Sequence, residues 1–324
     1  MLAKSVTELW KICASCLASD RGTTRTTTRR SGRGLLRLLG ALLACCATLA
    51  SAQQAGGAMD LQFPPEPSAF SALERPRMAL FKPEGAGPFP ALVLLHQCGG
   101  LGNARWQNES MLGWAKEAVA RGYVALLVDS LGPRGVDTVC FGPKGGVIFA
   151  RGVKDALQAA EHLEKFAFVD RKRIALAGFS WGAMVAVLAS SARWSSNAVP
   201  ATRFAAAVAF YPGCFTIRPP TVAAYEIVQP DIDHPLLALM GQLDTETPAD
   251  ECVAKLGAAK AAGAPVEWHV YPQATHCWDC RTLDGFSKTD VRGNRVTYRY
   301  SMEYTADSLQ RMFQFLDRSM VSRP

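Results

Sequence analysis

The sequence predicts a single α/β domain with one doubly wound, mostly parallel sheet flanked by helices. Continuous apolar runs alternate along the chain with segments whose apolar residues recur at helical spacing. Such runs are typical of strands that are covered on both faces, as in parallel sheets. One of them leads through a Gly-x-Ser-x-Gly sequence directly into a helical segment. A hydrophobic content of 49% supplies material for a core and excludes a disordered chain.

Six apolar runs are the expected strands. They cover residues 90–95, 123–128, 174–179, 204–211, 236–240 and 266–271. Helices are expected between them, from the apolar face that runs from Met111 to Val119 and ends at Gly122, from the face between Val153 and Leu163, and over residues 248–262. A last helix has Thr305 as its expected N-cap. In such sheets the site lies at the carboxyl ends of the strands.

Residues 1–52 have the form of a secretory signal. A long basic segment precedes an apolar run over residues 38–50, and Ala50-Ser51-Ala52 forms a small-residue cleavage site. The run is too short to span a bilayer, so no membrane span is expected in the mature chain. We expect export, to the periplasm or outside the cell. Lipid anchoring at Cys45, a twin-arginine signal at Arg29-Arg30 and a misassigned chain start are the alternatives. A linker over residues 53–75 and a folded domain over residues 76–324 should follow.

The basic residues are concentrated in this leader. It holds eight Lys and Arg against two acidic residues, which leaves 27 basic and 26 acidic residues in the rest of the chain. The formal net charge of +7 therefore implies no basic patch on the folded part. The sequence favours a small-molecule substrate and gives no support for a nucleic-acid partner.

The chemistry is expected around Ser180. The strand over residues 174–179 enters Gly178-Phe179-Ser180-Trp181-Gly182 and continues as a helix of small residues. Only glycine fits at 178 and 182 in so tight a turn, which holds the serine on a strained crest with its hydroxyl exposed. A glycine-rich turn without chemistry is the alternative, but the flanking strand and helix favour a nucleophile.

A serine hydroxyl needs a base, and the base must be oriented by an acid. In this architecture the acid and then the histidine follow the serine in the chain. Asp244, just past the strand over residues 236–240, is the expected acid, with Glu246 and Asp250 as alternatives. His276, in the loop after the last strand, is the expected base. The other histidines fit less well: His96 precedes the serine, His162 lies on a helix, His234 lies at the opposite edge of the sheet and His269 lies inside the last strand.

Acyl transfer builds negative charge on the carbonyl oxygen, which backbone N–H groups must stabilise. The N–H of Trp181, directly after the nucleophile, is one expected donor. The other should come from the loop after the first strand, with the N–H of Cys98 as the first choice and that of Gln97 as the next. An ordinary glycine turn is the alternative interpretation of this loop.

These motifs together resemble the dienelactone hydrolase family, whose members have the α/β-hydrolase fold. The resemblance covers residues 75–320 and is carried by Leu94 to Leu101, Arg121 to Ala125, Asp129 with Gly132 to Gly135, Gly178 to Gly182, Phe210 to Gly213, Gly241 to Asp244, and Tyr271-Pro272 leading to His276. It implies hydrolysis of esters or lactones without a metal or cofactor. It also implies that Ser180, Asp244 and His276 form a catalytic triad.

The chain departs from the family pattern at two positions. The best-known members have a cysteine nucleophile and a glutamate in the first loop, where this chain has Ser180 and Gln97. Since Gln97 cannot act as a base, activation must come from His276, which favours generic ester cleavage over the specific dienelactone activity. Family members also bind a substrate carboxylate with arginines. Arg134 and Arg281 lie in roughly corresponding loops, with surface arginines as the alternative.

Six cysteines lie outside the leader: Cys98, Cys140, Cys214, Cys252, Cys277 and Cys280. In an exported enzyme they suggest disulfides, although six cysteines permit 15 pairings. Their places after neighbouring strands favour Cys98 with Cys140 and Cys214 with Cys252, which leaves Cys277 and Cys280 either paired or free. A metal or redox site at this Cys-x-x-Cys would need a fourth ligand or a helix N-terminus, and neither is evident. Residues 280–300 are an expected polar insertion at the rim of the pocket.

The sequence therefore predicts an exported serine hydrolase that cleaves a small carboxylic ester or lactone through an acyl-enzyme intermediate. A deacetylase or acyl esterase that acts on acetylated sugars is the nearest alternative. A non-catalytic binding protein on a hydrolase scaffold is another, but such a protein would be expected to lack a triad residue.

Overall fold

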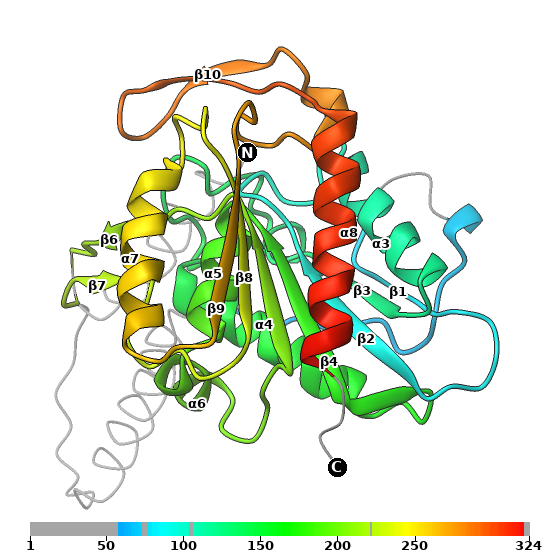
Figure 1. Cartoon of the computed structure of the whole chain (residues 1–324). Coiled ribbons are helices and arrows are strands. Elements are labelled where there is room, and N and C mark those ends of the chain that lie inside the picture. The colour runs from blue at the N-terminus through cyan, green and yellow to red at the C-terminus, as the bar shows by residue number, and fades with distance from the viewer. Residues whose placement is uncertain (1–57, 73–76, 104–105, 221, 321–324) are drawn as a thin grey trace, which may run out of the picture. The chain divides into compact units, whose positions relative to one another are not determined.

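The computed structural model describes residues 58–72, 77–103, 106–220 and 222–320. The leader, with Cys45 and Arg29-Arg30, lies outside these ranges. The described residues form a seven-stranded sheet with the strand order β1-β3-β2-β4-β5-β8-β9 (Figure 1). β1 pairs antiparallel with β3, and the other five pairs are parallel. The predicted mostly parallel sheet is confirmed.

All six predicted strands are present in this sheet. Its strands are β1 (Ala79–Phe81), β2 (Phe89–Leu95), β3 (Val124–Val128), β4 (Val169–Phe179), β5 (Ala206–Phe210), β8 (Leu236–Gly241) and β9 (Val266–Tyr271). The sequence pattern misses β1 because three residues are too few to show a strand period. Two short ladders lie outside the sheet: β6 (Thr216–Ile217) with β7 (Tyr225–Glu226), and β10 (Ser287–Thr289) with β11 (Arg295–Thr297).

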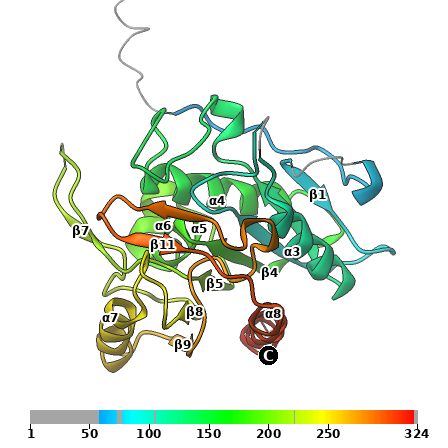
Figure 2. The same cartoon turned by 90° about the horizontal axis from the view of Figure 1, so that it is seen from above.

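Helices cover both faces of the sheet. α3 (Glu109–Ala120) and α8 (Met302–Ser319) belong to one apolar core, and α4 (Phe149–Leu163), α5 (Trp181–Ala189) and α7 (Ala249–Ala261) belong to the other. Seen from above, α4 and α5 lie on one side of the strands and α8 on the other (Figure 2). Successive residues of β2 enter the two cores in turn, with Val93 in one and Leu94 in the other. A short helix, α6 (Ala192–Ala198), follows α5.

The last helix begins earlier than the sequence predicts. Its N-cap is Ser301, whose side chain accepts the N–H of Tyr304. Thr305 lies inside the first turn, where its hydroxyl donates to the carbonyl of Ser301. The expected cap at Thr305 is therefore wrong, because the hydroxyl of Ser301 one turn earlier already caps the helix.

Residues 58–72, expected to belong to a linker, pack on the folded domain. The carboxylate of Asp60 binds Arg151 and Lys154 of α4 at 2.6 and 3.0 Å. Hydrogen bonds from Lys154 and Arg151 hold the pKa of Asp60 below its usual range. The ring of His162, in the last turn of α4, contacts the Pro64 carbonyl at 2.8 Å. Composition did not reveal this docking because the partners lie on a helix about 90 residues away.

Three disulfides join the six cysteines of the domain. They are Cys98–Cys140, Cys214–Cys252 and Cys277–Cys280, with Cα–Cα distances of 4.8, 5.0 and 5.3 Å. The first two are the pairs that the strand positions favour. The third closes the Cys-x-x-Cys, so of the two possibilities left open the structure contains the bonded one.

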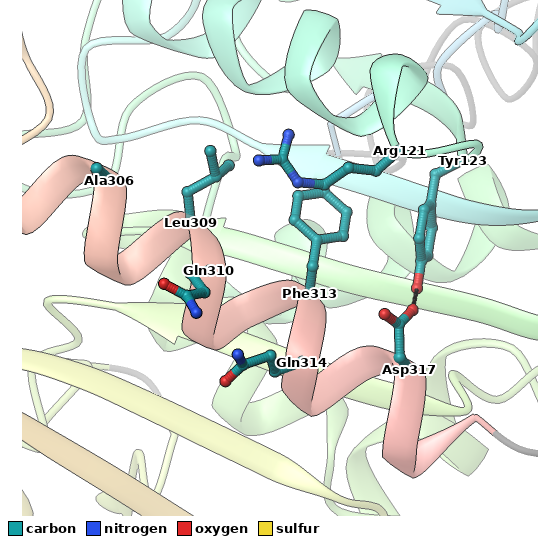
Figure 3. Close-up of a pocket in the computed structure, with 8 residues that line it drawn as sticks. All are labelled: Arg121, Tyr123, Ala306, Leu309, Gln310, Phe313, Gln314 and Asp317. Carbon is teal, nitrogen blue, oxygen red and sulfur yellow. Dashed lines mark hydrogen bonds between the residues drawn. The ribbon is translucent and has the colours of Figure 1, made fainter.

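A surface pocket lies between α8 and the start of β3 (Figure 3). The hydroxyl of Tyr123 donates to Asp317 across it at 2.7 Å, and the Arg121 guanidinium lies over the Phe313 ring. Tyr123 directly precedes β3, so this pocket lies at the amino ends of the strands, opposite the edge where Ser180 follows β4. Among the described residues, no helix is both long and apolar enough to cross a bilayer.

Arg134 belongs to the buried interior. Its guanidinium forms a two-pronged ion pair with Asp155 of α4 at 2.7 and 2.8 Å, and the side chains are 2% and 0% exposed. The remaining N–H groups donate to the carbonyls of Ser130 and Met59. All five guanidinium donors are thus occupied. The sequence-based expectation that Arg134 binds a substrate carboxylate is not supported, because no donor is left for one.

We expect Asp155→Asn to lower the free energy of unfolding by about 3–5 kcal/mol, because it leaves the buried guanidinium without its counter-charge. Urea denaturation measures the loss. Glu267→Gln is the matched control, since it neutralises one partner of the half-exposed Arg318–Glu267 pair and should change stability by less than about 1 kcal/mol. Equal losses in the two variants would contradict a structural role for the buried pair.

Candidate active site

Ser180 lies on a sharp turn between β4 and α5. Its backbone has φ 52° and ψ −110°, in the positive-φ region that L-residues rarely adopt. A Cβ at Gly178 would lie 2.0 Å from the Gly182 carbonyl oxygen, and one at Gly182 would lie 2.3 Å from the carbonyl oxygen of Leu95. Both glycines are therefore required for the chain to turn here. This is the strained elbow that the sequence predicts, although Ser180 is only 5% exposed.

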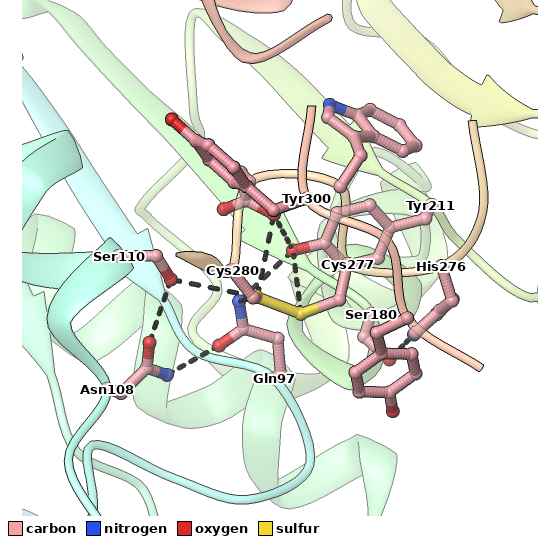
Figure 4. Close-up of a disulfide and its surroundings, with 12 residues drawn as sticks. Gln97, Asn108, Ser110, Ser180, Tyr211, His276, Cys277, Cys280 and Tyr300 are labelled. Carbon is pink, nitrogen blue, oxygen red and sulfur yellow. Dashed lines mark hydrogen bonds between the residues drawn. A yellow bond between two sulfur atoms is a disulfide. The ribbon is translucent and has the colours of Figure 1, made fainter. Parts of the chain in front are cut away.

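The structure brings the three predicted residues together. Nε2 of His276 lies 2.9 Å from Oγ of Ser180 (Figure 4). Nδ1 of His276 lies 2.7 Å from Oδ2 of Asp244. The other carboxylate oxygen of Asp244 accepts the N–H groups of Glu246 and Thr247 at 2.9 Å each. His276 is 2% and Asp244 is 3% exposed. The acid is thus held by backbone donors while it orients the imidazole.

Glu246, the alternative acid, has a different place. Its carboxylate lies 3.8 Å from Nε2 of His276, beside the nitrogen that faces Ser180, and not at Nδ1. Lys288 pairs with it at 2.7 Å, and the hydroxyl of Tyr298 donates to it at 2.9 Å. Both partners belong to the segment that carries β10 and β11, which lies over the carboxyl ends of the strands (Figure 1).

These charges set the protonation of the base. Burial works to lower the pKa of His276, but the carboxylates of Asp244 and Glu246 outweigh it and raise the pKa above its ordinary value. Burial likewise works to raise the pKa of Glu246, while the charges of His276 and Lys288 lower it on balance. Glu246 is therefore ionised beside the reacting nitrogen.

The predicted oxyanion donors belong to the start of α5 and to the loop after β2. Trp181 is the first residue of α5, so its N–H belongs to the turn that has no acceptor within the helix. In the loop after β2, the carbonyl of Gln97 accepts the N–H of Gly100 at 3.0 Å. Because a trans peptide points its C=O and N–H in opposite directions, the N–H of Cys98 faces away from that turn. The Cys98–Cys140 disulfide holds the loop from the other side.

His96 supports this loop and makes no contact with Ser180 among the contacts of the described residues. Its Nε2 accepts the N–H of Ser130 at 3.0 Å, so Nδ1 carries the proton and donates to the Gln97 carbonyl at 2.6 Å. Burial lowers the pKa of His96, which keeps the ring neutral. Its ring stacks on Trp181 with centroids 5.7 Å apart.

Arg281, the other predicted substrate-binding residue, begins the short helix η3 (Arg281–Leu283) and is exposed. Its backbone N–H donates to the Asp279 carbonyl. In the part of the chain that the structure describes, one group of three potential metal ligands occurs, formed by Cys277, Asp279 and Cys280. The two sulfurs are bonded to each other, so they offer no thiolate to a metal.

Sequence reasoning missed a buried polar network beside these loops. It joins Asp279, Tyr211, Gln97 and Asn108 by side-chain hydrogen bonds. The only hint in the sequence is an acidic residue between two cysteines next to the expected base. Its members are spread along the chain from residue 97 to residue 279, so no local pattern connects them.

The fold and this arrangement define a class of protein. A mostly parallel sheet with a serine at a strand-to-helix elbow, followed in the chain by an acid and a histidine that reach it, is the architecture of the α/β hydrolases. The sequence profile of the dienelactone hydrolase family matches residues 77–320. The chain belongs to the dienelactone hydrolase family.

Individual relatives agree with this placement. A curated "Putative carboxymethylenebutenolidase" of Yersinia pestis is 30% identical over 154 residues, which are 47% of this chain and 49% of the relative. The match thus spans about half the length of that relative. A "Putative Dienelactone Hydrolase" structure from Klebsiella pneumoniae is similar with a TM-score of 0.54 and 21% identity, covering 74% of this chain and 93% of that one. A thermophilic esterase from Thermogutta terrifontis with butyrate bound has a TM-score of 0.55 and 16% identity, over 76% and 91% of the two chains. Both structures show that the fold is shared.

We expect Glu246→Gln to lower the pKa of His276, because it removes a negative charge that stabilises the imidazolium. Lys288→Met should move that pKa in the opposite direction, since it removes a cation. An NMR titration of the His276 ring measures both shifts. Because only the neutral ring can accept the serine proton, the Glu246 variant should keep a competent base to lower pH.

Glu251→Gln is the control for this pair. It also removes a carboxylate, but one that lies on α7 and forms a solvent-accessible ion pair with Arg292, so the pKa of His276 should stay unchanged. An unchanged pKa in the Glu246 variant would show that this carboxylate does not act on the base.

Proposed function

We propose that the protein is a serine hydrolase that cleaves small carboxylic esters or lactones through an acyl-enzyme intermediate. The observation that carries the proposal is the hydrogen-bonded series Ser180–His276–Asp244 at a strained elbow. Membership in the dienelactone hydrolase family supports ester or lactone cleavage, and the name of the Yersinia relative points to a lactone.

In the proposed reaction, Oγ of Ser180 attacks the substrate carbonyl while Nε2 of His276 takes the hydroxyl proton. Asp244 keeps the proton on Nδ1 and stabilises the imidazolium that forms. When the tetrahedral intermediate collapses, the imidazolium gives its proton to the leaving alkoxide, and the acyl group remains on Ser180. Water, deprotonated by the same ring, then attacks the acyl-enzyme and releases the acid.

The developing oxyanion is proposed to accept the N–H groups of Trp181 and Cys98, with that of Gln97 as the alternative. Each such donor typically contributes about 10²–10³ in rate. The supporting geometry is the helix start at Trp181 and the outward-turned peptide after Gln97. The low exposure of Ser180, at 5%, favours small substrates. Arg281 remains the proposed partner for a substrate carboxylate.

We also propose that the protein is exported. The form of residues 1–52 supports it, as do the three disulfides of the domain, which persist in oxidising compartments. Lipid anchoring at Cys45 remains the alternative to a free, mature protein.

We expect Ser180→Ala to lower kcat for p-nitrophenyl acetate by at least about 10³-fold, because no other hydroxyl takes the place of the nucleophile. Ser196→Ala, which changes an exposed serine on α6, should retain full activity. A fluorophosphonate probe should label the wild-type protein at residue 180. Retained turnover in Ser180→Ala would overturn the assignment of Ser180 as the nucleophile. An absence of labelling with an intact fold would favour the non-catalytic binding protein instead.

A further inference from the structure

Asp279 is a buried carboxyl group that the proposed reaction does not use. It is 5% exposed and lies three residues after His276, between the two cysteines of the Cys277–Cys280 disulfide. The indole N–H of Trp114 donates to one of its oxygens at 2.8 Å, and the hydroxyl of Tyr211 donates to the other at 2.7 Å. Because the burial of an ionisable group costs free energy, we expect a carboxyl group at this depth to have a structural or functional role.

The hydrogen bonds continue from Tyr211 to the loop after β2. Nε2 of Gln97 donates to the Tyr211 oxygen at 3.1 Å, and Nδ2 of Asn108 donates to Oε1 of Gln97 at 2.6 Å (Figure 4). The same Asn108 amide also donates to the carbonyl of Gly100 at 2.9 Å. The network therefore holds both ends of the segment over residues 97–100, and Cys98 lies inside it.

Every bond in this series points the same way. Burial raises the pKa of Asp279, and the hydrogen bonds from Trp114 and Tyr211 work against it by stabilising the ionised form. In that form the carboxylate only accepts, so the single proton of Tyr211 is committed to Asp279. The Tyr211 oxygen must then accept from Gln97, which turns the amide oxygen of Gln97 toward Asn108. Oδ1 of Asn108 is left free to accept from Ser110 and from the N–H of Met111 at the start of α3. Asp279 thus favours this orientation of the Gln97 amide, and the backbone groups of Gly100 and Met111 hold Asn108 in the orientation that matches it.

We propose that Asp279 is a positioning residue for the oxyanion loop. It acts through Tyr211 and Gln97, and it fixes the direction of the hydrogen bonds that hold the Cys98 N–H in place. The proposal rests on the proposed function, in which that N–H binds the oxyanion. Small displacements of such donors have large effects on rate, because they are effective only when preorganised.

The first test is Asp279→Asn, which keeps the volume and removes one acceptor. The amide oxygen of the new side chain at position 279 accepts from Trp114, so its amino group donates to Tyr211. The Tyr211 hydroxyl must then donate to the oxygen of Gln97, which brings the amino groups of Gln97 and Asn108 face to face. We expect kcat for p-nitrophenyl acetate to fall about 10–100-fold with KM nearly unchanged. Affinity for a trifluoromethyl ketone analogue of the transition state should fall by the same factor.

The second test moves the carboxylate to the other end of the series. In D279N/Q97E, the amide at 279 donates to Tyr211, the Tyr211 hydroxyl donates to the carboxylate at 97, and that carboxylate accepts from Asn108. All three bonds are restored: the two that involve Tyr211 are reversed in direction, and Asn108 donates to residue 97 as it does in the wild type. Q97E alone places two carboxylates on the single proton of Tyr211 and should also lose activity. We therefore expect both single variants to be impaired and the double variant to recover most of kcat.

Asp317→Asn is the matched control. Asp317 also accepts a tyrosine hydroxyl, from Tyr123, but at the opposite end of the strands (Figure 3). Its kcat should equal that of the wild type. The inference would be overturned by a wild-type kcat in D279N, or by a double variant no more active than the worse single variant. Neither result would contradict the proposed serine hydrolase function.

Urea denaturation of the wild type, D279N, Q97E and the double variant tests the hydrogen-bonded series separately from the proposed esterase activity. If the series is directional, the stabilities of D279N and Q97E should be non-additive, with the double variant more stable than the sum of the single effects predicts. This coupling does not depend on turnover, so it decides the inference even if the wild type cleaves no ester and the proposed function fails. Additive stabilities would contradict the directional series.

Discussion

The hydrogen bond between Oγ of Ser180 and Nε2 of His276 is the contact on which the rest of the site depends. It joins residues 96 positions apart. One partner is fixed by the elbow, where two glycines allow backbones to approach closer than any Cβ would permit. The other is fixed by a loop after β9. They meet because the carboxyl ends of parallel strands share one edge of the sheet.

The same imidazole is enclosed by charge. Asp244 binds one nitrogen and Glu246 lies beside the other, while burial alone would have made the ring a weaker base. Lys288 and Tyr298 hold Glu246 in place, so the polar insertion between the last strand of the sheet and α8 helps to set the protonation of the base. What composition marks as a rim is therefore part of the electrostatics of the site.

The loop after β2 is restrained from two directions. A disulfide joins Cys98 to Cys140, and a polar network joins Gln97 to Tyr211 and Asn108. A loop that must present backbone donors to a transient charge gains from both, since donors that move must be reoriented at each turnover. Gln97 contributes here as a link in a buried network, a role that its amide can fill and that requires no proton transfer.

The sequence by itself determined the sheet, its six longer strands, the elbow at Ser180, and the positions of Asp244 and His276, because each depends on local periodicity or on chain order along a parallel sheet. The Cys98–Cys140 and Cys214–Cys252 pairs followed from the same strand order, whereas the sequence left the state of Cys277 and Cys280 open. Only the tertiary structure decided that Arg134 is bound to Asp155 and that Glu246 lies beside Nε2 of His276. It also decided that Ser301 caps the last helix and that Asp279 accepts the first hydrogen bond of a buried network. These outcomes depend on which side chains, distant in sequence, fall within about 3 Å of each other with matched donors and acceptors, and no spacing rule encodes that geometry.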